Sequence, residues 1–219
     1  MSGPQPAPGA GGSGDLGALL QAARDELAGV NSAREAGLAA CRRTIRAAGS
    51  AIRAVHRLDP DRAARLTSDS ESALREAQLA LRPFPAVAYA GFLHDAEKEY
   101  AEAVLTRALI DGSPLPDHRA LDVGLPAWLN GLAEAASELR RRLLDRLRRD
   151  ETSTAETLLS AMEDTYEALV GIDFPDAVTG GLRRSADALR AVLERTRSDV
   201  TTTMIQLRLR DALERAQPT

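Results

Sequence analysis

The sequence predicts an all-α fold, and both its composition and its periodicity support this prediction. The 219 residues contain 44% hydrophobic and 27% charged side chains, which is typical of a globular chain. Aromatic residues make up only 3%, whereas alanine, leucine, arginine and glutamate, which favour helices, are abundant. Aliphatic side chains recur every three or four residues through most of the chain, as they do on one face of an α-helix.

The chain divides into a short tail and one long helical region. Residues 1–14 are rich in glycine, proline and serine and are expected to form a flexible tail. Residues 15–219 are expected to form a single helical domain, because the helical periodicity begins there and continues along the rest of the chain. The first helix is predicted to end at Leu58, with a break or bend at Gly29 or Asn31.

Prolines and capping residues delimit the later helices. Asp59 followed by Pro60 provides an N-cap and a first helical residue, so the second helix begins there. Pro83 and Pro85 end that helix and begin the third, and Pro126 opens the fourth after a loop. The predicted helices span residues 15–58, 59–83, 85–110, 126–149, 152–170 and 176–215.

Several classes of protein are excluded by what the sequence lacks. One cysteine, Cys41, rules out a disulfide framework and is expected to serve as a small apolar residue of the first helix. No apolar run approaches the roughly 18–20 residues of a membrane span, and the first residues do not resemble a signal peptide. We therefore expect a cytoplasmic protein. No phosphate-binding loop, dinucleotide fingerprint or zinc-protease motif is present.

Carboxylates gather along one edge of the third predicted helix. Asp95, Glu99 and Glu102 follow one another at positions i, i+4 and i+7 beside its apolar stripe. Lys98 is the only lysine of the chain and is expected to pair with Glu102. Clustered oxygen ligands without histidine or cysteine suit Mg²⁺ or Mn²⁺, which support phosphodiester hydrolysis. The alternative is a solvated acidic face, paired with arginines of another helix.

Arginines form a basic strip in a chain whose net charge is −4. Residues 42–65 carry seven arginines against two aspartates, and residues 140–149 carry a second arginine cluster. The planar guanidinium group binds phosphate oxygens in pairs, so such a strip is typical of a nucleic-acid-binding surface. The alternative is a set of exposed helix faces and inter-helix ion pairs.

Three segments resemble segments of the translin family, closest to its translin-associated factor X (TRAX) branch. Residues 41–57, CRRTIRAAGSAIRAVHR, are similar to the family's first characteristic helix, and residues 135–141, AASELRR, to its Ser/Gly-Glu-Leu-x-Arg segment. Residues 99–104, EYAEAV, resemble a segment of the TRAX branch that translin itself lacks. The resemblance runs from about residue 33 to 215. The lysine-poor composition is typical of a prokaryotic or archaeal member.

The resemblance implies a bundle of about seven helices, some of them long, that assembles into a hollow octamer around single-stranded RNA or DNA. It implies metal-dependent endoribonuclease activity through two glutamates and an aspartate. The glutamates match Glu99 and Glu102, and the aspartate matches Asp164, with Glu163 as the alternative. The arginines expected to contact nucleic acid are Arg42, Arg43, Arg46, Arg53, Arg57 and Arg141.

Three functions remain open at this point. The first is a Mg²⁺- or Mn²⁺-dependent endoribonuclease that cleaves single-stranded RNA inside a homo-oligomeric shell, with or without a paralogous subunit. The second is a shell that binds single-stranded RNA or DNA without catalysis, and the third is a helical scaffold that binds no nucleic acid. Glutamate at both position 99 and position 102 favours the enzyme, because a protein that only binds phosphate gains nothing from anions facing it.

Overall fold

The computed structural model describes residues 12–216, which fold into helices and connecting turns with no β-strand in that range. The predicted all-α fold is therefore confirmed. Residues 12–216 form eight helices, against six ranges predicted from the sequence and the roughly seven implied by the family resemblance, and two of the eight are only four residues long. In chain order they are α1 (Gly12–His56), α2 (Pro60–Leu81), α3 (Pro85–Ala88), α4 (Phe92–Asp111), α5 (Leu125–Leu147), α6 (Thr152–Val170), α7 (Asp176–Thr179) and α8 (Leu182–Ala216).

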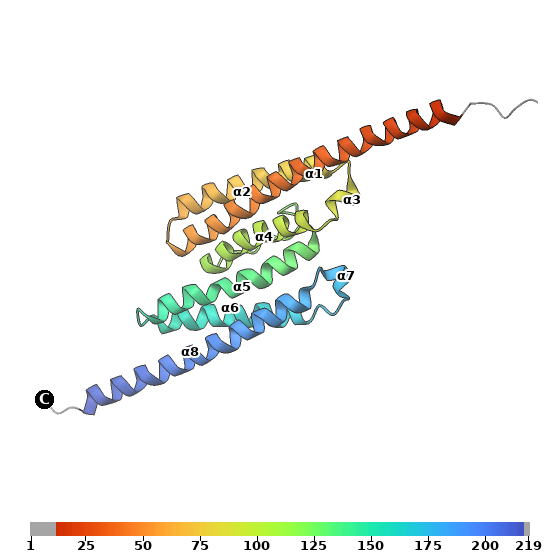
Figure 1. Ribbon diagram of the computed structural model, residues 1–219. Helices are drawn as coiled ribbons and strands as arrows, with labels where there is room; N and C mark the ends of the chain where they lie inside the picture. The colour runs from red at the N-terminus through yellow and green to blue at the C-terminus, as the bar shows by residue number, and fades with distance from the viewer. Residues whose placement is uncertain (1–11, 217–219) are drawn as a thin grey trace, which may run out of the picture.

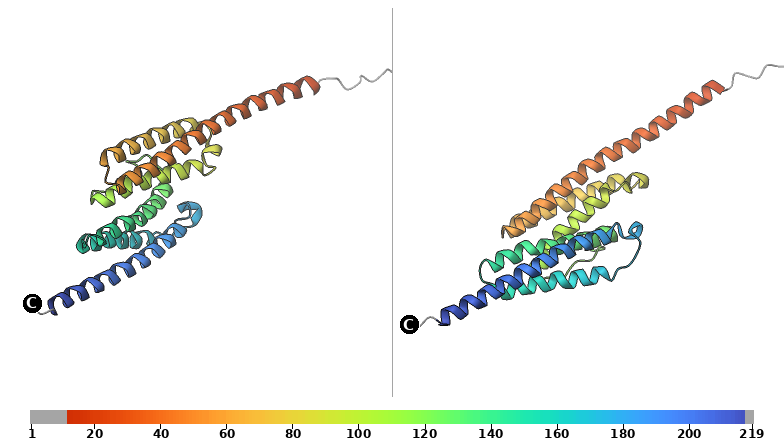
Figure 2. Two further views of the ribbon diagram at one scale, coloured as in Figure 1. Left: turned by 60° about the vertical axis from the view of Figure 1, so that its left-hand side comes forward. Right: turned by 60° about the horizontal axis from the view of Figure 1, so that its bottom comes forward.

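The long helices lie side by side in a flattened stack (Figure 1). Helices α1 and α2 form a hairpin on one side, α4 and α5 lie in the middle, and α6 and α8 close the other side. The two further views keep this order (Figure 2). Leucines and alanines dominate the core between these layers, and small alanines allow the helices to approach closely. None of the helices that the structure describes is apolar over the length that a membrane crossing requires.

Helix α1 is continuous over 45 residues, so the expected break or bend at Gly29 or Asn31 does not occur. It begins at Gly12, slightly before the expected start, while residues 1–11 of the expected tail lie outside the described residues. Packing starts near Gly37, where the helix meets Leu81 of α2. Cys41, one turn further on, is buried as expected, and burial raises the pKa of its thiol to about 11.

The turn between α1 and α2 forms as the sequence predicts. The backbone N–H of Arg62 donates a hydrogen bond of 3.1 Å to Oδ1 of Asp59, which therefore caps α2. Leu58, the last residue before the cap, has a φ of +60°, in the left-handed region. The Asp59 N–H reaches back to the Ala54 carbonyl at 3.1 Å, which closes the end of α1 in the manner of a Schellman motif.

Two predicted helices are each divided in the structure, and glycines explain both breaks. The helix expected over residues 85–110 is split by Gly91, whose φ of +99° cannot continue a right-handed helix. The helix expected over residues 176–215 is split by Gly180 and Gly181, with φ of +62° and +85°. Each break produces a four-residue helix followed by a long one, which accounts for the larger number of helices.

Both long terminal helices extend beyond the bundle at opposite ends (Figures 1 and 2). The early part of α1 and the late part of α8 carry large apolar side chains that are at least half exposed, or nearly so. These side chains are Leu16, Leu19, Leu20 and Leu27 on α1, and Ile205, Leu209 and Leu213 on α8. A single protomer therefore leaves two apolar helix faces uncovered.

Candidate metal centre

Helices α4 and α5 approach each other so closely at one point that only glycine fits. A Cβ atom at Gly131 of α5 would lie 2.8 Å from the carbonyl oxygen of Lys98 and 3.0 Å from the backbone nitrogen of Glu102, both on α4. This close contact fixes the register between the two helices. It places the turn of α5 that follows Gly131 beside the carboxylates of α4.

Three carboxylates from the two helices meet at this contact. Glu99 and Glu102 of α4 and Glu134 of α5 each offer an oxygen atom, and these atoms all lie within 4.8 Å of one another. Within residues 12–216, this is the group of three potential ligands whose spacing suits a metal ion. The cluster joins segments about 30 residues apart, and the sequence predicted only its α4 half.

Glu102 is the buried member of the cluster, with 8% of its surface exposed. Burial raises the pKa of its carboxyl group to about 8, and the neighbouring charges of Glu134, Glu99 and Glu138 add to the effect. Lys98 only partly offsets these charges. A carboxylate held ionised in such a place needs a cation, so the electrostatics of the cluster favour cation binding.

Lys98 contacts the cluster, but it does not bond the glutamate that the sequence suggested. Its Nζ donates hydrogen bonds of 2.6 and 2.7 Å to the two carboxylate oxygens of Glu134, and it lies 3.3 Å from Glu99. Burial lowers the pKa of Lys98, but its bonds and charge interactions with Glu134 and Glu99 outweigh burial and raise it. The ammonium group thus positions Glu134 and partly neutralises the site.

A histidine from α1 extends the acidic centre along α5. Nε2 of His56 lies 2.6 Å from Oε2 of Glu138, which is one helical turn after Glu134. The His56 side chain is 1% exposed, and its Nδ1 has no hydrogen-bond partner among the described residues. The bond from His56 lowers the pKa of Glu138. Three helices, α1, α4 and α5, therefore contribute to one polar centre.

Asp164, the expected third carboxylate, lies elsewhere in the fold. It is exposed on α6 and does not belong to the group formed by Glu99, Glu102 and Glu134. Glu163, the alternative, binds the Arg197 guanidinium of α8, with one bond of 2.9 Å. The sequence analysis missed Glu134, although it lies one helical turn before Glu138 of the SELR segment, on the same face of α5.

Four of the six arginines expected to contact nucleic acid form one exposed stripe on α1. Successive residues of a helix are 100° apart, so Arg42, Arg46, Arg53 and Arg57 fall within about 60° of arc. Arg43 lies off this stripe and pairs with a glutamate of α2. Arg141, the sixth, is exposed on α5. Its charge adds to the effect of His56 in lowering the pKa of Glu138.

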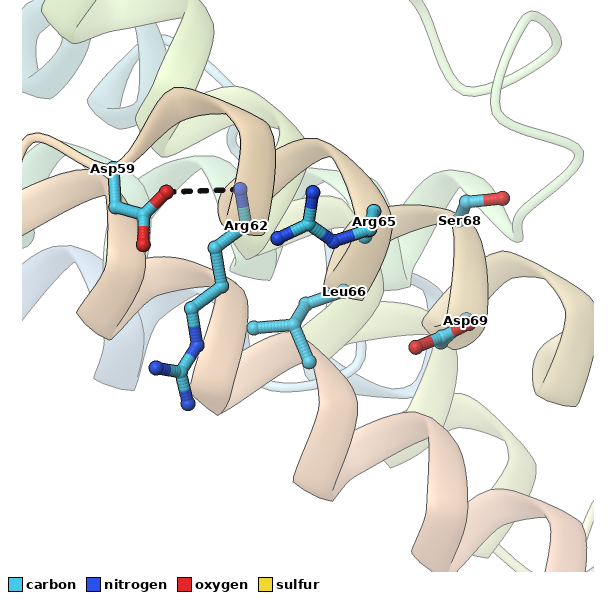
Figure 3. A pocket seen from close by; sticks show the side chains of 6 residues that line it. All are labelled: Asp59, Arg62, Arg65, Leu66, Ser68 and Asp69. Carbon is cyan, nitrogen blue, oxygen red and sulfur yellow. Dashed lines mark hydrogen bonds between the residues drawn. The ribbon is translucent and has the colours of Figure 1, made fainter.

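The basic surface continues into the first turns of α2. An open hollow of about 590 Å³ is lined by residues that include Asp59, Arg62 and Arg65. Figure 3 shows the side chains of both arginines on α2, after the Asp59 cap. A second, smaller hollow of about 110 Å³ brings Arg62 next to Arg53 and Arg57 of the α1 stripe. The corner between α1 and α2 therefore joins the arginines of both helices into one basic surface.

Comparisons with known proteins agree with this fold. No protein-family model matches the chain. The uncharacterized protein MJ0175 of Methanocaldococcus jannaschii is 31% identical to it over 194 residues, which are 87% of this chain and 85% of that protein. The structure of AfC3PO in a complex with duplex RNA superimposes with a TM-score of 0.78 at 31% identity, covering 85% of this chain and 97% of AfC3PO. The crystal structure of AfC3PO gives the same values.

A more distant structure shares the fold alone. The crystal structure of apo-NeC3PO has a TM-score of 0.76 at 18% identity and covers 84% of this chain and 96% of its own. The shared helix layout places this chain in the class of all-helical C3PO proteins. With 31% identity over nearly the full length of AfC3PO, the chain belongs to the C3PO/translin family.

Proposed function

We propose that this chain is a metal-dependent endoribonuclease of the TRAX type that cleaves single-stranded RNA inside an oligomeric shell. The observation that carries the proposal is the convergence of Glu99, Glu102 and Glu134 within 4.8 Å of one another. Such crowding of carboxylates in a partly buried site is unfavourable unless a cation offsets their charge.

The side chains of the cluster fit Mg²⁺ or Mn²⁺. All three donors are carboxylate oxygens, which these hard ions prefer over nitrogen or sulfur ligands. Glu99, Glu102 and Glu134 would hold the ion, and Asp164 remains the alternative third ligand that the family resemblance implies. When bound, the ion supplies activation of a water molecule and charge stabilisation on the phosphodiester.

The residues around the cluster then bind and orient the strand. The arginine stripe of α1 attracts the phosphate backbone and holds it through paired hydrogen bonds. Lys98 holds Glu134 in place and adds positive charge beside the reacting phosphate. His56 keeps Glu138 ionised at the edge of the site, which strengthens the attraction for a cation.

One observation supports RNA binding, and another supports assembly of several copies. AfC3PO, which shares 31% of its residues with this chain, forms a complex with duplex RNA. The uncovered apolar faces of α1 and α8 provide surface for contacts between copies. We therefore propose a homo-oligomer, an octamer by resemblance to the family, with room for a paralogous subunit.

A second function is favoured by Lys98. Because its ammonium group already bonds Glu134 and contacts Glu99, the cluster is partly neutralised without a metal. This arrangement fits a shell that binds single-stranded RNA or DNA without cleaving it. Binding that weakens with salt but does not respond to chelators would identify such a shell.

The experiment compares cleavage by the full-length chain and two variants. Unstructured and duplex RNA, both end-labelled, are incubated with Mg²⁺, with Mn²⁺ or with EDTA. We expect cleavage of the unstructured RNA only with metal, and its loss in Glu102→Gln. Asp95→Asn, an exposed carboxylate on the same helix but outside the cluster, is the matched control and should cleave like the parent.

Three results would contradict the proposal. Cleavage by Glu102→Gln at the rate of the parent would show that the cluster is not the active site. RNA retention without cleavage, unchanged by EDTA, would leave the non-catalytic shell, and a chain that retains no RNA at low salt would leave the helical scaffold.

A further inference from the structure

An apolar pocket lies at the corner where α1 turns into α2. It has a volume of about 290 Å³ and opens between this corner and the ends of α4 and α5. Val55, Leu58 and Ile110 provide its apolar surface, and Arg107 and Arg142 stand among its lining residues. Its volume is at the lower limit of ligand pockets, roughly 300–1,000 Å³, which suits one planar ring system.

The pocket continues the same faces of α4 and α5 that carry the acidic cluster. Ile110 follows Glu99 by eleven residues on α4, three turns along one face and about 17 Å away. Arg142 follows Glu138 by four residues on α5, one turn and about 6 Å away. Stacked nucleotides rise 3.4 Å each, so the pocket lies within a few nucleotides of the cluster.

Leu58 occupies a position where its side chain costs stability. Its φ of +60° is in the left-handed region, at the end of a helix where glycine is usually found. Leu58 does not contribute to the hydrophobic core, because 53% of its surface is exposed. Its apolar side chain instead forms a wall of the pocket.

Two arginines and two aspartates line the pocket, and Arg142 is the arginine without an ion pair among the described residues. Arg107 is 3.4 Å from Asp111, and Asp59 is engaged as the cap of α2. On α5, Arg140 and Arg146 pair with Asp199 and Glu151, whereas Arg142 forms no such pair within 4.0 Å among the described residues. An apolar floor beside an unpaired guanidinium group complements a nucleotide, whose base is apolar on its faces and whose phosphate is anionic.

We propose that this pocket receives a base of the bound RNA, a few nucleotides from the scissile phosphate, and so sets the position or sequence preference of cleavage. The inference rests on the proposed nuclease function for its setting. Binding of a base does not itself require the metal. An experiment without metal can therefore test the pocket separately from the nuclease function.

The test compares Leu58→Gly with Asp122→Gly in the full-length protein. Leu58→Gly removes the wall and relieves the left-handed backbone, so we expect an equal or higher melting temperature. We also expect a KM for short RNA raised about five- to tenfold at nearly unchanged kcat, from the loss of one leucine's contacts. Asp122 also has positive φ, at +53°, but lies outside the pocket, so Asp122→Gly should change neither constant.

A second measurement needs no cleavage and no metal. Saturation-transfer NMR with each of the four nucleoside monophosphates in EDTA should show transfer to the base protons with the parent and Asp122→Gly, and loss of it with Leu58→Gly. If the parent fails to cleave RNA but this transfer depends on Leu58, the pocket stands and the nuclease proposal fails.

Three results would overturn the pocket itself. The first is a parent that cleaves RNA while Leu58→Gly keeps the parental KM and the parental transfer. The second is the absence of any transfer to the parent. The third is a change in oligomer size on Leu58→Gly, measured by light scattering, because the wall would then be a contact between copies.

Discussion

His56 and Glu138, 82 residues apart in the sequence, are joined by a 2.6 Å contact between Nε2 and Oε2. The histidine ring is almost fully enclosed, whereas about a third of the glutamate side chain remains exposed. The pair connects α1 to α5 across the end of the acidic cluster. It therefore couples the stability of the bundle to the arrangement of charge at the site.

Replacing His56 by phenylalanine tests this coupling. His56→Phe keeps a ring in the buried space but removes the donor to Glu138, so we expect the free energy of unfolding to fall by about 1–3 kcal/mol. Urea denaturation measures the change. Arg43→Gln is the control, because it breaks an exposed pair with Glu76 that contributes less than about 1 kcal/mol. Equal effects of the two substitutions would show that the buried pair contributes no more to the free energy of unfolding than the exposed pair does.

The third carboxylate of the site can be identified by a pair of variants. Loss of a residue that only supports a metal ligand costs about 10–100-fold, so loss of a ligand itself should cost at least about 100-fold in kcat/KM. We expect this loss for Glu134→Gln and parental activity for Asp164→Asn, which removes an exposed carboxylate of α6. Cleavage assays with Mg²⁺ give both values. The reverse result would return the role to Asp164.

Metal removal should make stability depend on pH through Glu102. Its pKa rises from the ordinary 4.5 to about 8 in the folded protein, so the folded state binds a proton that the unfolded chain has released. The free energy of unfolding of the metal-free protein should therefore be highest below pH 4.5, as far as Glu102 contributes, and fall as pH rises towards about 8. Urea denaturation in EDTA across this range measures the fall.

Two controls isolate that effect. Glu102→Gln should flatten the pH dependence relative to the parent, because the titrating group is gone. Mg²⁺ added at about pH 8 should restore stability to the parent by binding the ionised cluster. A parent and variant with parallel pH profiles would show that Glu102 titrates normally.

The contact between α4 and α5 predicts a sharp effect at Gly131. A Cβ atom there would overlap the backbone of α4, so Gly131→Ala should destabilise the protein by about 1–3 kcal/mol and reduce cleavage by displacing Glu134. Gly49→Ala on α1 is the control, since its new Cβ would lie 3.6 Å from the nearest side-chain atom. We expect Gly49→Ala to raise the melting temperature slightly. A Gly131→Ala protein as stable as Gly49→Ala would mean that the helices separate freely.

The arginine stripe predicts the salt dependence of RNA binding. Each phosphate contact on a single strand contributes about −0.7 to the slope of log K against log salt. The double variant Arg53→Gln, Arg57→Gln should therefore reduce the magnitude of this slope by about 1.4. Filter binding of unstructured RNA at several salt concentrations gives the slope. Arg119→Gln, an exposed arginine of the loop before α5, should leave it unchanged.

The sequence predicted the fold well wherever local chemistry decides the structure. The Asp59 cap and the following proline begin α2 where expected, and the continuous apolar stripes give the long helices. The breaks at Gly91 and Gly180 were missed, because one glycine within a helical pattern does not by itself show that φ is positive. A Cβ at Gly180 would also lie only 3.0 Å from the His94 ring, a tight contact in addition to the positive φ.

The site was predicted only in part for a different reason. Glu99 and Glu102 lie on one helix, so their meeting follows from helical periodicity alone. Glu134 reaches them only through the packing of α5 on α4 at Gly131, and no spacing within a helix encodes such a contact. Asp164 was chosen by resemblance of a short segment, which carries no information about what lies opposite it in space.

The leucine-bearing ends of α1 and α8 have a consequence for the life of the newly made chain. In the proposed homo-oligomer, contacts between copies would cover these side chains, whereas a free protomer exposes them to the chaperones and proteases that bind apolar segments. The amount of the protein in the cell would then depend on the rate at which protomers associate as well as on the rate of their synthesis. Protomers that do not assemble would be degraded, and dilution would dissociate the oligomer and abolish its activity before the helices unfold.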